Sequence, residues 1–125
     1  MGPDPSIERW MRDGKFRVAV LEIFGARCPI TGCEVLEAID AAHIRGVADD
    51  GDDDPKNGLV LRTDLHRLFD AHLMSVNPAD GTVCIDPDCD ASYGDYHGKV
   101  IKLPRRGPSL SQFENHYRTF CTETQ

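Results

Sequence analysis

The chain has 125 residues, of which 40% are hydrophobic and 28% charged, and this composition is typical of a single soluble globular domain. Its formal net charge of −7 excludes a wholly basic surface, although five of the 21 acidic residues lie between Asp49 and Asp54 and leave room for a DNA-binding face elsewhere. No apolar run approaches the roughly 18 residues of a membrane span and the start does not resemble a signal peptide, so we expect a cytoplasmic protein.

The first predicted element is a helix over residues 15–24. Phe16, Val20 and Phe24 recur at helical spacing, and Gly25 suits a left-handed C-terminal cap. The β-branched residues of this segment leave a strand as the alternative. We expect residues 1–14 to form an N-terminal tail, frayed at its first five residues, and residues 15–121 to form one domain.

The middle of the chain predicts a strand, a loop, a second strand and a helix. A turn with Pro and Gly precedes them at residues 28–32. The strand, the polar loop, the second strand and the helix follow at residues 35–44, 45–57, 58–61 and 63–73. Thr63 or Asp64 can cap the helix, and its apolar side chains Leu65, Leu68, Phe69 and Leu73 share one face.

The C-terminal part predicts a second hairpin and a last helix. The hairpin pairs residues 73–76 with 82–85 around a turn at 77–81, and residues 98–104 form another short extended piece. The helix begins near Ser111, with Glu114 completing a capping box. Its apolar stripe is Leu110, Phe113, Tyr117 and Phe120. Together the elements predict the α+β class.

Three polar residues stand out in the predicted strand–loop–strand–helix segment, residues 35–73. His43 ends the first strand, Asn57 stands at the return of the loop, and His66 lies in the first turn of the helix, four residues before Asp70. One imidazole with a pKa near neutrality can take a proton from water, and a second can hold a divalent metal that stabilises charge on a phosphodiester. Taken singly, each has an ordinary structural interpretation, as a core or surface histidine or as a turn asparagine.

The order and spacing of these residues are more specific than the residues themselves. The segments CPITG, AAHIRG and NGLVLRTDLHRLFDAHLMSV strongly resemble the HNH nucleases. They look most like the branch with the signature C-x-x-T-G, A-A-H-I, N-G-L-x-L-R-x-D-L-H-x-L-F-D, which is common in restriction and anti-phage defence nucleases. The tail YHGKVIKLPRR…FENHYRTF is similar to the C-terminal extension of many members, so the resemblance covers about residues 15–121.

This resemblance implies a ββα-metal (His-Me finger) core with an N-terminal helix, a following β-hairpin and a C-terminal helix. It implies that His43 is the general base, that Asn57 positions the base, and that His66 ligates the metal. The implied reaction is the endonucleolytic hydrolysis of DNA to 5′-phosphate and 3′-hydroxyl ends with Mg²⁺ or Mn²⁺.

The second metal ligand departs from the broad family pattern. Many HNH enzymes carry an acidic or His ligand directly before the base, and here that position is Ala42. Because side chains alternate along a strand, Asp40 shares the side of residue 42, roughly 6–7 Å further along. Asp40 is therefore our candidate second ligand, with Asp64 and Asp70 as alternatives.

The five cysteines admit two interpretations. Two pairs of equal spacing could form a structural four-thiolate zinc site from Cys28, Cys33, Cys84 and Cys89. The C-x₄-C spacing is wider than the usual pair, and the branch signature needs only the position of Cys28. Free, buried thiols are therefore the favoured interpretation.

Several cations flank the proposed catalytic residues. Arg45 and Arg62 are the favoured contacts to DNA phosphates because they lie next to those residues in the sequence. The acidic run of residues 49–54 is interpreted first as a solvated loop turned away from DNA, with an extra metal site or a regulatory brake as alternatives.

The main hypothesis is thus a small metal-dependent HNH DNA endonuclease. Target choice would come from a sensor domain or a partner protein, and two cuts on opposite strands would need a dimer. The rival hypothesis is an inactive nucleic-acid-binding or zinc-stabilised module that retains the fold.

Overall fold

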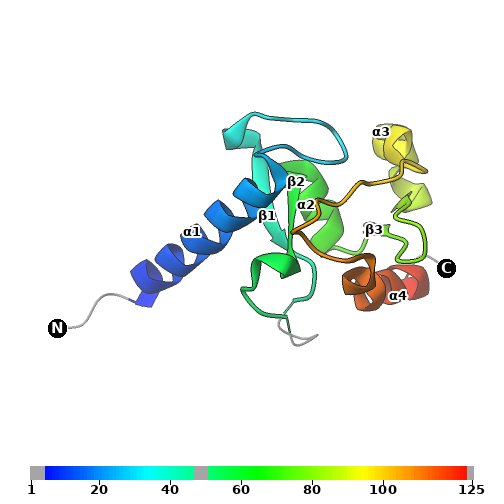
Figure 1. The fold of residues 1–125 in the computed structure, drawn as a ribbon. Helices are drawn as coiled ribbons and strands as arrows, with labels where there is room; N and C mark the ends of the chain where they lie inside the picture. The colour runs from blue at the N-terminus through cyan, green and yellow to red at the C-terminus, as the bar shows by residue number, and fades with distance from the viewer. Residues whose placement is uncertain (1–4, 47–50, 124–125) are drawn as a thin grey trace.

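The computed structural model describes residues 5–46 and 51–123 of the chain, and it describes the side chains from residue 14 onward. Over these residues helices and strands alternate along the chain (Figure 1). The helices are α1 (Pro5–Phe24), α2 (Thr63–Asp70), α3 (Asp90–Tyr93) and α4 (Glu114–Glu123). The strands are β1 (Ile39–His43), β2 (Gly58–Arg62), β3 (Met74–Val76) and β4 (Val83–Ile85).

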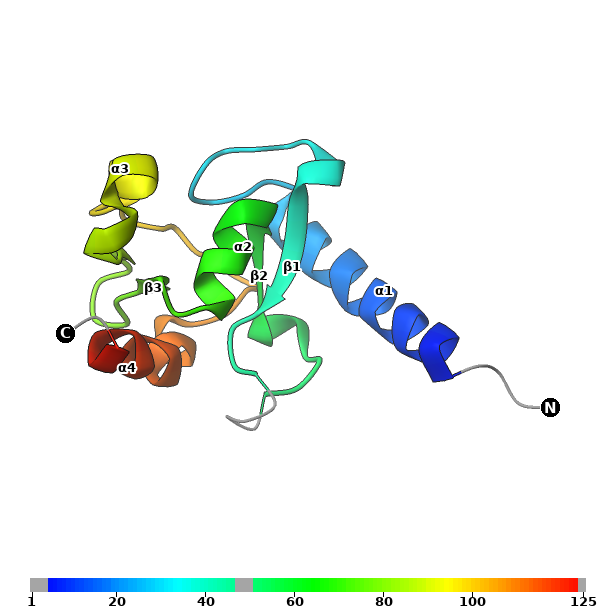
Figure 2. The same ribbon diagram turned by 180° about the vertical axis from the view of Figure 1, so that it is seen from behind.

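A two-stranded antiparallel sheet occupies the middle of the molecule. Strands β1 and β2 pair with Asp40 opposite Leu61 and His43 opposite Gly58. Figures 1 and 2 show α1 on one face of this sheet and α2 on the other. Strand β2 runs directly into α2 at Arg62, so the sheet and the helix form one continuous unit.

Helix α1 begins ten residues before its predicted start at Lys15. Proline suits the first turn of a helix because the amide hydrogen that it lacks has no partner there in any case, and the structure places Pro5 at that position. The predicted tail is therefore helical from residue 5, and residues 1–4 lie outside the described residues. The predicted end is confirmed, because Gly25 follows Phe24 with φ of 66°.

The first strand is shorter than predicted. Residues 36–38 form a 3₁₀ turn, and β1 begins only at Ile39. The guanidinium of Arg17 donates to the carbonyls of Leu36 and Ile39 at 3.0 and 2.8 Å, so helix α1 holds this turn in place. The second strand, predicted at residues 58–61, is confirmed.

Helix α2 ends three residues before its predicted end and starts without the predicted cap. The amide of Leu73 donates to the carbonyl of Leu68, and His72 adopts φ of 57°, which is a left-handed termination. At the other end the N-cap position is Arg62 rather than Thr63 or Asp64. Asp64 instead accepts both guanidinium bonds of Arg62, at 2.7 and 2.9 Å.

The predicted second hairpin is confirmed, with β3 and β4 paired around the turn at residues 77–81. The extended piece at residues 98–104 adds one bridge, between Val100 and Thr82. A 3₁₀ turn at Leu110–Phe113 precedes α4, and the predicted capping box at Ser111 is wrong, because that hydroxyl pairs with the Ser109 hydroxyl at 2.8 Å.

One hydrophobic core joins the two hairpins. The rings of Phe69 in α2 and Phe113 before α4 meet edge to face, 6.3 Å apart. On the other face of the sheet α1 lies so close to β2 that a side chain at Gly58 would overlap Val20. The predicted α+β class is confirmed, with a hairpin and helix consistent with an HNH nuclease core. Among the helices of residues 5–46 and 51–123, none combines the length and the apolar character needed to cross a membrane.

Candidate active site

His66 lies between two carboxylates. Its Nδ1 is 2.9 Å from Oδ2 of Asp40 on β1, and its Nε2 is 3.2 Å from Oδ2 of Asp70, one turn further along α2. The imidazole is about a quarter exposed, which leaves it accessible from solvent. The three groups form a row that connects strand β1 to helix α2.

The charges in this row reinforce one another. Asp70 and then Asp40 raise the pKa of His66 above its usual value, although partial burial lowers it. The same contact with His66 lowers the pKa of the Asp70 carboxyl. At pH below the raised value the histidine is thus an imidazolium that bridges two carboxylates.

The strand register explains why Asp40 reaches His66. Asp40 is opposite Leu61, one residue before the strand passes into α2, so β1 carries it alongside the first turn of the helix. Ala42, the position of a metal ligand in many HNH enzymes, is fully buried in the core. The structure thus brings the candidate second ligand beside the predicted first one.

His43 lies at the end of β1 with two close neighbours. Its ring stacks on Phe16 of α1, with centroids 4.0 Å apart and planes within 2°. Its Nε2 is 2.9 Å from Oδ1 of Asp53. His43 also contributes to lowering the pKa of Asp70, so the two predicted histidines belong to one electrostatic neighbourhood.

The acidic run is part of this neighbourhood, contrary to the favoured interpretation of a loop turned away. Asp53 contacts the imidazole of His43, and the backbone carbonyl of Asp52 accepts a bond from Asn57. Asp54 accepts the amide of Lys56 and so begins the 3₁₀ turn that leads to Asn57. Asp49 and Asp50 lie outside the described residues.

Asn57 acts on the backbone of the loop. Its amide donates to the carbonyls of Arg45 and Asp52 at 3.0 and 2.9 Å, and its side-chain oxygen accepts the Arg45 amide at 2.9 Å. The residue is buried, and Gln112 donates a further bond to the same oxygen. Asn57 therefore fixes the two ends of the loop that follows His43 and carries Asp53.

The two predicted phosphate-binding arginines differ in their surroundings. Arg62 donates twice to Asp64, and its guanidinium lies 5.6 Å from the centre of the Tyr96 ring. Arg45 is half-buried, and its Nε has no hydrogen-bond partner within the described part of the chain. Of the two, Arg45 is therefore the one with an unpaired guanidinium nitrogen, and that nitrogen is buried from solvent.

The four cysteines predicted as an optional zinc site are distributed over different elements. Cys28 is buried beside the turn that ends at Cys33, and the Cys28 amide donates to the Cys33 carbonyl. Cys84 lies on β4, where Tyr117 and Cys121 influence its pKa, which burial raises. None of these four forms a disulfide, and only Cys28 is buried, whereas Cys33, Cys84 and Cys89 are partly exposed; the choice between free thiols and a zinc site stays a prediction.

The donors near His66 form a row and do not surround a point. Across residues 5–46 and 51–123 no group of three or more His, Cys, Asp or Glu side chains is arranged as a metal site. One imidazole nitrogen and one carboxylate are nevertheless side by side at Asp40 and His66. The carboxylate of this pair suits Mg²⁺ or Mn²⁺, since Mg²⁺ takes few protein ligands and completes its shell with water and phosphate oxygens, whereas an imidazole nitrogen is a ligand more typical of transition metals.

Sequence reasoning missed three contacts of the site: Phe16 against His43, Asp53 against His43, and Gln112 on Asn57. Phe16 stood out only as part of a helical apolar stripe. Gln112 lies 55 residues from Asn57, and no local pattern marks it. Only Asp53 carried a signal, because a carboxylate run beside a proposed base is unusual.

In this chain a two-stranded antiparallel sheet is followed at once by a helix, and the sheet and the helix each contribute one of the candidate histidines. This arrangement defines a class of small α+β domains with a polar site where the hairpin meets the helix. Residues 28–77 match the model of the HNH endonuclease family, and this segment contains Asp40, His43, Asn57 and His66. The predicted resemblance to HNH nucleases is thereby confirmed over this segment, and the match indicates a nuclease-type function. A search among curated proteins gave no significant match.

Proposed function

We propose that the protein is a metal-dependent DNA endonuclease in which His43 is the general base. The observation that carries the proposal is the row Asp40–His66–Asp70 with His43 beside it, within the segment that matches the HNH family. The products would be 5′-phosphate and 3′-hydroxyl ends.

His43 is suited to remove a proton from water because its ring is held in one orientation. Phe16 restrains the plane of the imidazole, and Asp53 pairs with Nε2. A carboxylate on one ring nitrogen favours the tautomer in which the other nitrogen is free to accept a proton. Asn57 supports this arrangement indirectly, through the loop backbone.

Asp40 and His66 would hold the divalent ion, with Asp70 pairing with the second nitrogen of His66. When bound, Mg²⁺ or Mn²⁺ would neutralise charge on the scissile phosphate and on the departing oxygen. The ion needs a neutral imidazole, so it competes with the proton that the two carboxylates favour on His66. Arg45 is the proposed phosphate contact, and Arg62 keeps a secondary role because Asp64 already binds it.

The partners of the protein would be DNA and, for target choice, a sensor domain or partner protein; double-strand cleavage would need two copies. We retain as predictions the defence role, the cytoplasmic location, a single domain over residues 15–121, and the specific signature branch.

The test is cleavage of supercoiled plasmid in Mg²⁺ and in Mn²⁺, with metal-free EDTA controls. We expect nicked and then linear products, and a loss of about 10²- to 10⁴-fold in His43→Ala. His97→Gln is a matched control, because His97 lies in the second hairpin region and accepts the Ile85 amide. Equal inertness of the wild type and His43→Ala in every metal would refute the proposal.

A second candidate function is DNA binding without cleavage. Two observations favour it: both nitrogens of His66 are already paired with carboxylates, and the described residues lack a group of three metal-binding side chains. Binding of a duplex that is unchanged by metals, with no cleavage products, would support this candidate over the nuclease.

A further inference from the structure

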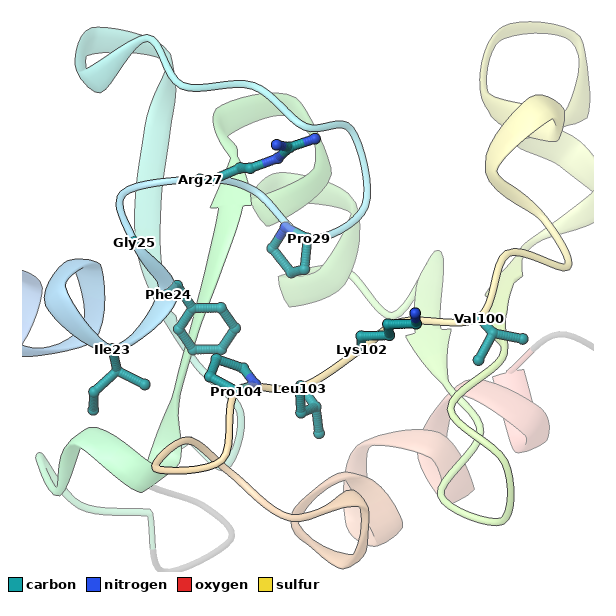
Figure 3. A pocket seen from close by; sticks show the side chains of 9 residues that line it. All are labelled: Ile23, Phe24, Gly25, Arg27, Pro29, Val100, Lys102, Leu103 and Pro104. Atoms are coloured by element: carbon teal, nitrogen blue, oxygen red, sulfur yellow. The ribbon is translucent and has the colours of Figure 1, made fainter.

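A groove lies between the end of α1 and the segment of residues 98–104 (Figure 3). Its volume is about 600 Å³, which is within the range of roughly 300–1,000 Å³ of sites that hold ligands. Most of its lining is apolar, as with Phe24, Leu103 and Pro104, and Val100 at its end is 65% exposed. Apolar side chains gathered in a groove are a common mark of a binding surface.

The groove is on the face of the sheet that is opposite to α2. Figure 1 shows residues 98–104 crossing in front of β2, on the side of α1, and Figure 2 shows α2 on the nearer side when the molecule is seen from behind. His66 and Asp70 belong to α2, so the groove is separate from the candidate active site. An occupant of the groove would leave the row of carboxylates and His66 accessible.

Two cations border the groove, Arg27 and Lys102, and both are exposed. The segment around Lys102 is basic throughout: residues 96–113 contain Lys99, Arg105 and Arg106 as well, and no acidic residue. This concentration is unusual in a chain with a net charge of −7. Glu34 pairs with Arg27 at 3.6 Å, but both side chains are more than half exposed, so the pair is weak and exchangeable. The groove therefore favours an anionic occupant.

The segment beside the groove also has an open backbone edge. Its neighbours pair with the second hairpin, since Val83 donates to the Lys99 carbonyl and Ile101 donates to the Gly81 carbonyl. In an antiparallel pair the residue between such bonds turns its own amide and carbonyl outward, and that residue is Val100. An extended peptide can bind to such an edge as an additional strand, with alternate side chains in the groove.

From these observations we propose that the groove is a docking site for an extended acidic–apolar segment of a partner protein. The apolar side chains of the segment would lie between Phe24 and Leu103, and its carboxylates would pair with Arg27 and Lys102. Phe24 is the one aromatic ring among the lining residues and the other apolar ones are aliphatic or proline, which favours peptide side chains over nucleobases, because bases bind best between several stacked aromatic rings. This inference concerns binding alone and does not depend on the proposed nuclease activity.

The experiment uses the full chain as bait for a display library of random twelve-residue peptides. We expect the selected peptides to alternate acidic and apolar residues. The most enriched peptide, synthesised with a fluorophore, should bind at least tenfold more weakly to Lys102→Glu and should weaken with rising salt. It should bind within twofold of wild type to the control Arg118→Glu, which makes the same charge change at an exposed position on α4.

Hydrogen exchange then locates the bound peptide. Its binding should slow exchange of the Val100 amide and leave exchange in α4 unchanged. The proposal is overturned if no acidic–apolar consensus emerges, if Lys102→Glu and Arg118→Glu bind alike, or if Val100 stays unprotected. Binding of a single-stranded oligonucleotide that is lost only in Lys102→Glu would also overturn it, in favour of nucleic acid. Circular dichroism confirms the fold of each variant, and plasmid cleavage measured in parallel tests the nuclease separately.

Discussion

The described part of the chain contains two hairpin–helix units, and in each of them a histidine lies between two polar partners. In the first unit, β1 and β2 with α2, His66 is about a quarter exposed and lies between the carboxylates of Asp40 and Asp70. In the second unit, β3 and β4 with α4, His116 is only 5% exposed. Its Nε2 donates to the Phe69 carbonyl at 2.6 Å, and its Nδ1 pairs with the Ser75 hydroxyl at 2.7 Å.

The comparison teaches that partners and solvent access, and not residue type, distinguish the histidine proposed to act in the reaction from the one that stabilises the core. His116 stacks on Phe69 at 3.6 Å and bonds the last turn of α2 from within the core. Its two hydrogen-bond partners named here are neutral, although its electrostatic interaction with Asp70 lowers the pKa of that carboxyl, and its burial gives it a role in stability. His66 has anionic partners and an open side, which suit the exchange of a proton or an ion.

The largest expected effect is the loss of cleavage in His66→Ala. We expect a decrease of about a thousandfold or more, because metal stabilisation of the transition state is worth several kcal/mol. The free energy of unfolding should change by only about 1 kcal/mol, since partly exposed ion pairs contribute little. Single-turnover plasmid cleavage and urea denaturation measure the two quantities. If His66→Ala cuts DNA at the rate of the wild type, His66 takes no part in the reaction, and the contrast with His116 fails.

The reverse result is expected for His116→Ala. Removing a buried ring leaves a cavity and two unpaired polar groups, which should lower the free energy of unfolding by about 2–4 kcal/mol. Cleavage per folded molecule should remain within several-fold of wild type at low temperature. His116→Phe keeps the ring and should lose less, about 1–3 kcal/mol. If both variants unfold at the same urea concentration as the wild type, the claim that His116 stabilises the fold is wrong.

The smallest expected effect is on how the free energy of unfolding depends on acidic pH, through Asp64 at the start of α2. Arg62 holds the pKa of Asp64 below its usual value of 3.8, and Tyr93 adds a hydrogen bond at 3.0 Å. A lowered pKa in the folded state stabilises the protein above pH 3.8, and this contribution is lost as the pH falls through the folded value.

Asp64→Asn should therefore lower the free energy of unfolding near pH 6 by about 1 kcal/mol or less, after allowance for solvent screening of this half-exposed pair. The difference from wild type should shrink toward pH 3. Thermal melts from pH 3 to 6 measure it, and a difference that grows on acidification would contradict the assigned sign.

Much of the fold could be predicted because its signals are local. The short apolar run at residues 58–61, the stripe of Leu65 and Phe69, and the Asn-Pro-Ala-Asp-Gly turn are each contained within a few residues. The boundaries that sequence reasoning missed have causes that no local sequence pattern marks. Arg17 stabilises the turn before β1 from another helix, and the left-handed conformation of His72 ends α2.

The candidate site divides in the same way. The motif spacing pointed to His43, Asn57 and His66 as one group. The alternation of side chains along a strand then added Asp40, because Asp40 lies on the same side of the strand as Ala42, where many HNH enzymes carry a metal ligand. Asp53 and Phe16 against His43, by contrast, follow from how a loop and a separate helix pack on the end of β1.

By itself, the sequence determined the order of hairpin and helix, the apolar faces and the candidate site residues, since these depend on periodicity and on side-chain type. Only the tertiary structure decided which histidine lies between carboxylates, which groups Asn57 hydrogen-bonds, and that a groove opens on the face of the sheet opposite to α2. These depend on contacts across tens of residues, such as the bond from Gln112 to Asn57, and burial and partner charge at each contact are properties of the packed chain.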